Sequence, residues 1–282
     1  MTDRPLRLIL AEAVRRLERA EVPSPARDAR KLLYGVLETS VLPDPAQPLA
    51  PGAVARFDAM IAQRETRVPV SRILGHRAFH GHEFLISNDV LDPRPDTEHL
   101  VDAGLESPFD RVLDLGTGSG CILLSLLGER PAASGVGVDL SEPALTVARA
   151  NARALGIDPA RVAFAVSDWF GAVEGAFELI VSNPPYIPAA DLAGLQPEVR
   201  DHEPRIALTD GGDGLGAYRA IAAGVMDHLA PGGRLIVEIG PDQATPVAAL
   251  FQQAGLQEIS LRQDHDGRDR VLIGQRKGNN SA

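Results

Sequence analysis

The chain has 282 residues, of which 44% are hydrophobic and 23% charged, a composition typical of a globular protein with one large or two modest domains. Its net charge of −10 argues against a protein that gains its affinity by neutralising many nucleic-acid phosphates, so we expect no direct nucleic-acid partner. No apolar run is long enough to cross a bilayer and the amino terminus lacks the plan of a signal peptide, so we expect a cytoplasmic protein without a membrane partner.

Residues 1–75 carry the pattern of a small helical domain. Apolar side chains recur at helical spacing over residues 6–20, which predicts an amphipathic helix. Ser24 supplies a capping residue and Pro25 a proline at the first helical position, which together predict a second helix ending near residue 37. A proline-rich connection follows, and residues 51–67 are expected to form a third helix.

Charge is divided unevenly along the chain. Residues 1–77 contain 13 Lys and Arg against 9 Asp and Glu, a balance of +4, which leaves 15 against 29, a balance of −14, for the rest. The basic part is open to two interpretations, either solvated helix faces or a surface that meets an acidic or RNA-associated partner.

A change of pattern after residue 75 predicts a second domain. Residues 76–91 resemble a β-hairpin linker around Gly81, and residues 92–277 alternate strands with helices. This alternation predicts a largely parallel sheet covered on both faces, with two antiparallel strands at its carboxyl-terminal edge. Strands are expected at residues 112–115, 136–139, 162–166, 179–181, 235–237, 256–261 and 271–273, and helices near 120–130, 142–156, 214–230 and 243–254.

A glycine-rich turn follows the first of these strands and predicts a nucleotide-type binding loop. It comprises Gly116, Thr117, Gly118, Ser119 and Gly120. A dinucleotide fingerprint would need glycine at the next position, where the chain has a cysteine, so the pattern is Gly-x-Gly-x-Gly.

That residue, Cys121, is the only cysteine, which excludes an internal disulfide and a multi-cysteine metal site. We expect it to pack within a helix and expect no bound metal ion.

Two further strand ends carry candidate cofactor ligands. Asp139 ends the second strand, where a carboxylate can accept both ribose hydroxyls of an adenosine, although an acid here can also cap a helix. Asp168 and Trp169 close the third strand, where they could bind an exocyclic amine and pack on an adenine ring. As the only tryptophan, Trp169 could instead fill the core.

The fourth strand ends in Asn183, Pro184, Pro185 and Tyr186, the most informative stretch of the sequence. The prolines remove two N–H donors and fix φ, so the site is rich in acceptors. The Asn183 side-chain oxygen and the Pro184 carbonyl can orient a planar amide-type or aromatic nitrogen for attack on an electrophilic methyl group, with Tyr186 stacked on the planar group. No strong base is needed, because positioning and preorganised polar groups supply the catalysis.

With these motifs the chain resembles the HemK/PrmC family of peptide chain release factor glutamine methyltransferases. The resemblance spans nearly the whole chain and includes the runs Arg72-Ile73-Leu74-Gly75, Phe79-His80-Gly81, Pro93-Arg94-Pro95-Asp96-Thr97-Glu98 and Glu203-Pro204. It implies an α/β, Rossmann-like class I methyltransferase domain with a seven-stranded sheet and an amino-terminal helical domain for substrate recognition. It also implies S-adenosylmethionine as cofactor, with contacts at Gly116 to Gly120, Asp139, Trp169 and Asn183, and S-adenosylhomocysteine as product. The implied acceptor is the glutamine of the Gly-Gly-Gln motif of class I release factors.

Two other acceptors stay open: a glutamine of a ribosomal protein, and an exocyclic amine of DNA or RNA. The run from Pro93 to Glu98 favours the release factor, although residues 94–98 could simply cap the following helix. The segment 187–213 is long for a connection without secondary structure, so we expect it to cover the acceptor glutamine and contact the release factor.

Overall fold

The computed structural model describes residues 4–39, 41 and 43–278 and divides into two compact units. One unit comprises Met1–His76 together with Gln196–His202, and the other comprises Arg77–Leu195 and Glu203–Ala282. Residues 196–202 lie inside the range expected for the methyltransferase domain, yet they group with the helical unit. Within the described part of the chain, no helix has the length and apolar content needed to cross a bilayer.

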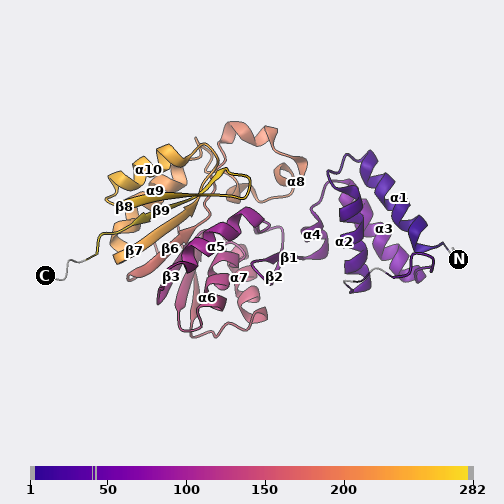
Figure 1. The fold of residues 1–282 in the computed structure, drawn as a ribbon, viewed down its shortest axis with the longest axis horizontal. Coiled ribbons are helices and arrows are strands. Elements are labelled where there is room, and N and C mark those ends of the chain that lie inside the picture. The colour runs from indigo at the N-terminus through magenta and orange to yellow at the C-terminus, as the bar shows by residue number, and fades with distance from the viewer. Residues whose placement is uncertain (1–3, 40, 42, 279–282) are drawn as a thin grey trace. The chain divides into compact units, whose positions relative to one another are not determined.

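The helical unit is built from three amphipathic helices around one core (Figure 1). The third is two residues shorter than expected, and although Ser24 occupies the N-cap position of the second, its side chain makes no capping hydrogen bond to described residues. A fourth, short helix was not expected; it follows Pro69 and ends at Gly75, whose left-handed φ of 78° stops it. The helices are α1 (Leu6–Arg19), α2 (Pro25–Leu37), α3 (Pro51–Glu65) and α4 (Val70–Leu74).

A short segment of the distant loop 187–215 completes this unit. Helix α8 (Pro197–Arg200) carries Glu198, which accepts hydrogen bonds from Arg64 at 2.7 Å and Arg67 at 2.6 Å. Arg64 is only 4% exposed and also binds Asp28 of α2. Burial by itself would raise the pKa of Glu198, but the hydrogen bonds from Arg67 and Arg64 hold it at about 2.

The larger unit begins at the second residue of the expected hairpin, β1 (His76–Phe79) and β2 (His82–Leu85), and contains one seven-stranded sheet. The strand order is β5-β4-β3-β6-β7-β9-β8, in which β3 to β7 are parallel and both β9 and β8 pair antiparallel. Both antiparallel strands were expected at this edge. The strands are β3 (Arg111–Leu115), β4 (Ser134–Asp139), β5 (Val162–Val166), β6 (Phe177–Ser182), β7 (Leu229–Glu238), β8 (Gln257–Gln263) and β9 (Asp269–Gln275).

Helices cover both faces of the sheet, because side chains along each central strand alternate between two cores. On β6, Leu179 and Val181 pack in one core, whereas Ile180 packs in the other. The first core includes residues of α5 (Glu98–Leu105), α6 (Cys121–Glu129) and α7 (Glu142–Ala154), and the second includes residues of α9 (Gly216–His228) and α10 (Ala244–Gln253), as Figure 1 shows.

Strand order reverses between β3 and β6, since β3 is followed along the chain by β4 and β5 on one side and by β6 on the other. In open α/β sheets the carboxyl edge at such a reversal is where ligands bind. The glycine loop leaves β3 there, and Asn183 follows β6 at the same edge.

Candidate active site

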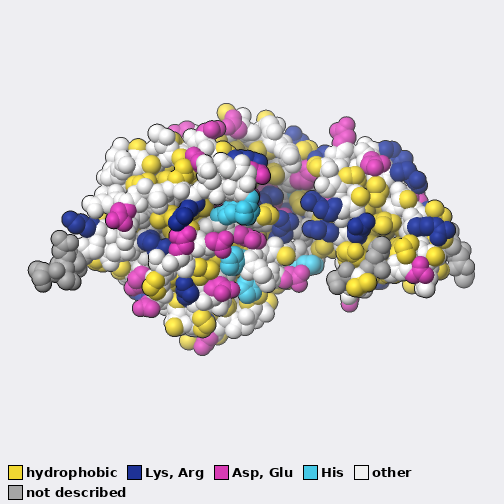
Figure 2. Space-filling view, in the orientation of Figure 1, with side chains coloured by type: hydrophobic (Ala, Val, Ile, Leu, Met, Phe, Trp, Pro, Cys, Tyr) yellow, Lys and Arg dark blue, Asp and Glu magenta, His cyan; other side chains and the backbone are white. Residues whose placement is uncertain are grey.

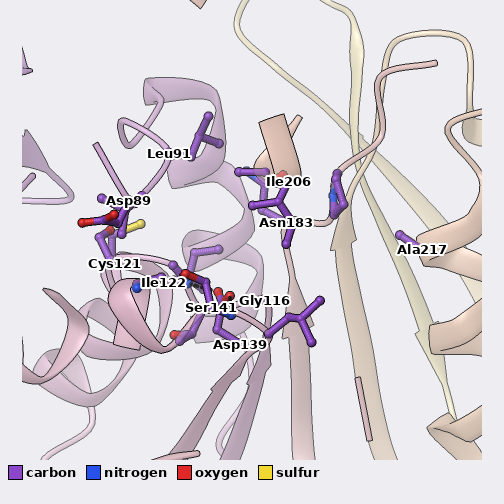
Figure 3. Close-up of a pocket in the computed structure, with 18 of the residues that line it drawn as sticks. Asp89, Leu91, Gly116, Cys121, Ile122, Asp139, Ser141, Asn183, Ile206 and Ala217 are labelled. Atoms are coloured by element: carbon purple, nitrogen blue, oxygen red, sulfur yellow. Dashed lines mark hydrogen bonds between the residues drawn. The ribbon is translucent and has the colours of Figure 1, made fainter. Parts of the chain in front are cut away.

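A cavity of about 500 Å³ opens at this edge of the sheet, a size that suits a nucleotide-like ligand. Figure 3 shows Gly116, Asp139 and Asn183, which follow or end three different strands, gathered around it. All of its lining residues belong to the larger unit.

The glycine loop forms the floor of this cavity. Gly116 and Gly118 have φ values of 71° and 55°, and a Cβ at either would meet no protein atom, so the backbone there is open toward the cavity. Gly120 differs, because its Cβ would touch Leu124 and Ala148 at 3.0 and 3.3 Å. This third glycine does not line the cavity, and its smallness serves the packing of α6 against α7.

Asp139 shapes the loop from the end of β4. Its Oδ2 accepts the Gly118 N–H at 2.8 Å and its Oδ1 accepts the Ser141 N–H at 2.9 Å. Burial raises the pKa of this carboxyl group. The N-cap of α7 is Ser141, whose side chain accepts from Ala144, so the capping role considered for Asp139 belongs to its neighbour.

The pair Asp168 and Trp169 also lines the cavity, with Asp168 exposed and Trp169 half-buried. The Trp169 backbone has a φ of 49°, and its carbonyl accepts the Ser167 hydroxyl at 2.8 Å. Its ring packs against the second core as well. Trp169 therefore packs in the core and also lines the cavity, so it occupies both of the positions that the sequence left open.

The Asn-Pro-Pro-Tyr run is only partly in the cavity. Asn183 and Pro185 line it, whereas Pro184 and Tyr186 are not among its lining residues. The Tyr186 hydroxyl instead donates to Glu238 Oε1 at 3.1 Å, and burial together with the charge of Glu238 raises the pKa of this phenol. The Tyr186 carbonyl accepts a hydrogen bond from Gln243 at 3.0 Å.

Sequence reasoning missed the support beneath Asn183. Thr97 accepts the Asn183 Nδ2–H at 3.2 Å and donates to Glu238 Oε2 at 2.6 Å. Thr97 and Glu238 are each 2% exposed. The sequence could have indicated Glu238 as a site residue. It is an acid that follows the apolar strand residues 235–237, just as Asp139 is an acid at the end of its own strand. For residues 94–98 the structure shows a short 3-10 turn, Pro95–Thr97, whose last residue reaches the site.

Other lining residues also had no clear sequence signal. Leu91 and Ile206 approach the cavity from segments far apart in the sequence (Figure 3). Cys121 lines the cavity besides packing against the first core, and burial raises the pKa of its thiol to about 12, which keeps it neutral.

The loop that follows Tyr186 is not without secondary structure. It contains the 3-10 turns Ala189–Gly194 and Arg205–Ala207, with α8 between them. Between α8 and the second of these turns, Glu203 accepts a hydrogen bond from Arg94 at 2.9 Å. On the face shown in Figure 2, Lys and Arg side chains are prominent on the helical unit with some acidic groups among them, whereas acidic and basic groups mix on the larger unit.

The residues at the cavity fit an adenosine. Open glycine backbone allows close approach, Asp139 supplies an acceptor at a strand end, and the Trp169 ring supplies a flat wall. The sheet order and this cavity define a Rossmann-like α/β domain with a nucleotide-type cofactor site, which confirms the predicted fold class.

Comparisons with known proteins give the family. The profile of the methyltransferase small domain matches residues 78–194, and that of the PrmC N-terminal domain matches residues 9–75. The release factor glutamine methyltransferase of Cereibacter sphaeroides is 52% identical over 93% of this chain and 95% of its own length; that of Rhodospirillum rubrum is 51% identical over 93% and 82%. A methyltransferase structure from Pyrococcus furiosus, at 17% identity, covers 78% of this chain and 98% of its own with a TM-score of 0.54, and shares the fold.

This chain belongs to the release factor glutamine methyltransferase family. The resemblance drawn from the sequence motifs is therefore confirmed, and with it a methyltransferase that depends on the predicted cofactor, S-adenosylmethionine.

Proposed function

We propose that this protein transfers a methyl group to the side-chain amide nitrogen of the glutamine in the Gly-Gly-Gln motif of class I release factors. The observation that carries the proposal is that Asn183 follows β6 at the rim of the cavity formed by the glycine loop and Asp139, in a chain 52% identical to a release factor glutamine methyltransferase. Because release factors act in translation, the proposed place of the reaction is the cytoplasm.

The proposed cofactor contacts follow from the cavity walls. Residues 116–119 offer open backbone, Asp139 accepts the ribose hydroxyls, and Trp169 packs on the adenine ring with Asp168 near its amine. Gly120 contributes indirectly, because its packing sets the start of α6. When bound, S-adenosylmethionine supplies an electrophilic methyl group on a sulfonium sulfur that leaves as a neutral thioether.

Asn183 is the proposed centre of the acceptor site. Its Nδ2 donates to Thr97, so its Oδ1 remains as an acceptor for an N–H of the substrate amide. With the Pro184 carbonyl as second acceptor, the nitrogen would be held pyramidal, with its lone pair directed at the methyl group that the cofactor would supply. The nitrogen then loses one proton to water, which needs no strong base. Pro185 and the ring of Tyr186 shape the amide site.

The helical unit is the proposed recognition domain for the release factor. Its balance of +4 over residues 1–77 contrasts with −14 for the rest, which gives it a different electrostatic surface. The loop 187–213 is proposed to cover the acceptor glutamine. We propose no direct nucleic-acid partner.

A labelling experiment tests the proposal. The protein is incubated with methyl-labelled cofactor and, separately, with a release factor, a ribosomal protein preparation and nucleic acid. Label in the release factor is expected. Label in nucleic acid alone, or in a ribosomal protein alone, would assign the enzyme to one of the two other acceptor classes.

A further inference from the structure

Asn183 has a side chain whose two ends are chemically opposite, and its proposed role requires one of them to face the substrate. The Oδ1 end accepts hydrogen bonds, whereas the Nδ2 end donates them. An Asn183 turned by 180° about its last torsion would present N–H groups to a substrate amide that needs acceptors. Something in the protein therefore has to select one orientation.

A buried chain of hydrogen bonds lies directly behind this side chain. It runs from Asn183 Nδ2 to Thr97 Oγ1 at 3.2 Å, and from Thr97 Oγ1 to Glu238 Oε2 at 2.6 Å. The other oxygen of Glu238 accepts from the Tyr186 hydroxyl at 3.1 Å. Each link joins groups from different elements, since Thr97 precedes α5 and Glu238 ends β7.

The direction of this chain is set at Glu238. Both oxygens of Glu238 act as acceptors, Oε2 from the Thr97 hydroxyl and Oε1 from the Tyr186 hydroxyl, so the single hydroxyl proton of Thr97 is committed to this carboxyl group. Burial raises the pKa of Glu238, although the hydrogen bond from Thr97 and the nearby charge of Arg270 oppose the shift. Arg270 is itself held by Asp264 at 3.1 Å and Asp96 at 3.3 Å.

With its proton committed, Thr97 can offer only lone pairs to Asn183 and must receive the Nδ2–H. We propose that Thr97 and Glu238 are positioning residues that fix the orientation of the Asn183 amide, so that Oδ1 faces the acceptor nitrogen. This inference rests on the proposed role of Asn183. It gives the run from Pro93 to Glu98 a role in the reaction beyond starting a helix.

Thr97→Val tests the inference, because it keeps the shape of the side chain and removes the hydroxyl. The expected result is a kcat about 10- to 100-fold lower, since the amide then samples both orientations, with the KM for release factor and the Kd for cofactor within about twofold of wild type. Thr97→Ser keeps the hydroxyl and should restore kcat to within about threefold. Thr146→Val, on the exposed side of α7, is the matched control and should behave as wild type.

Three results would overturn the inference: a Thr97→Val enzyme with wild-type kcat, a Thr97→Ser enzyme as impaired as Thr97→Val, or a loss of cofactor affinity in proportion to kcat. Removing a buried hydrogen-bonding partner lowers the free energy of unfolding, so the thermal unfolding of each variant is also measured. If Thr97→Val does not fold, Thr97→Cys replaces it; its thiol is a weak hydrogen-bonding group, and a kcat equal to that of Thr97→Ser would count against the proposal.

The same assays separate this inference from the proposed function. A wild-type protein that labels some other nitrogen but not a release factor overturns the function alone. The variants are then compared on that substrate, where Asn183 needs the same orientation.

Discussion

Asp114, Asp139 and Glu238 each have a pKa raised by burial, and all three lie at or below the carboxyl edge of the sheet. Asp114 is fully buried, and its Oδ2 accepts the Thr117 hydroxyl at 2.7 Å. Burial, with a contribution from the charge of Asp139, raises the pKa of Asp114 from 3.8 to about 7, although Thr117 opposes the shift. Below that pH the folded protein holds a proton that the unfolded chain releases near pH 4.

This linkage predicts a pH-dependent difference between wild type and Asp114→Asn in the absence of cofactor. Between pH 4 and 7 the folded state binds more protons than the unfolded state, so the unfolding free energy of wild type falls as pH rises. The Asp114→Asn variant has no group that titrates at this position. The unfolding free energy of wild type should therefore fall relative to that of the variant as pH rises to about 7. Thermal melts of both proteins from pH 4.5 to 8 measure it; a difference that stays constant, or that grows in favour of wild type, would refute the shifted pKa.

Asn183→Ala gives the second prediction at this scale. Loss of the preorganised Oδ1 acceptor should lower turnover by about 10²-fold or more. Cofactor affinity should change little, because residues 116–119, Asp139 and Trp169 remain in the cavity to bind it. Single-turnover assays and a separate titration of cofactor distinguish the two effects, and near-normal turnover would remove Asn183 from its assigned role.

Among the elements, the loop that follows Tyr186 is held at several points along its length. Glu198 is fixed within the helical unit by Arg64 and Arg67, and Glu203 by Arg94. At its far end, the Gly214 carbonyl accepts from Gln243, which also binds the Tyr186 carbonyl. The middle of the loop that we propose covers the acceptor glutamine is therefore fixed within the helical unit, and its two ends within the larger unit.

Glu198→Ala should release the middle of this loop. Two buried or half-buried arginines then lose their shared carboxylate, and amide exchange of residues 196–202 should speed up about tenfold or more. Hydrogen-exchange mass spectrometry measures this. Asp201→Ala is the matched control, because its ion pair with Arg200 is exposed on both sides and contributes little. Equal protection in the Glu198 variant and wild type would show that these contacts do not hold the loop.

Element positions were largely predictable from the sequence, whereas their mutual contacts were not. Periodicity located α1, α2 and all seven strands of the sheet, because apolar patterns follow directly from which face is buried. It missed α4, which has five residues and too few turns for a periodic pattern. The glycine-rich loop and the Asn-Pro-Pro-Tyr run each follow a strand, and they predicted the edge of the sheet at which the cavity lies. The link from Thr97 to Glu238 spans 141 positions and depends on side-chain geometry, which no local pattern records.

Across the whole molecule, the described parts of the two units have separate hydrophobic cores. The larger unit packs helices on both faces of its sheet, and the helical unit packs α1 to α3 around its own interior. The cavity is formed entirely by the larger unit. Cofactor binding and release factor recognition are accordingly expected to be separable.

A fragment of residues 77–282 should bind cofactor within about threefold of the full chain, since every lining residue of the cavity is present. Its kcat/KM for release factor should fall by at least about tenfold, because the proposed recognition unit and the anchor of Glu198 are missing. Calorimetric titration and steady-state assays measure the two quantities. Full activity of the fragment on release factor would show that the helical unit has no part in recognition.

Tandem mass spectrometry of a class I release factor after incubation with this protein and S-adenosylmethionine tests the central claim most directly. The account predicts one added methyl group on the side-chain amide of the Gly-Gly-Gln glutamine, and none when that glutamine is replaced or when Asn183→Ala is used at matched concentration. A methyl group on another residue, or an unmodified release factor alongside a methylated nucleic acid, would contradict it.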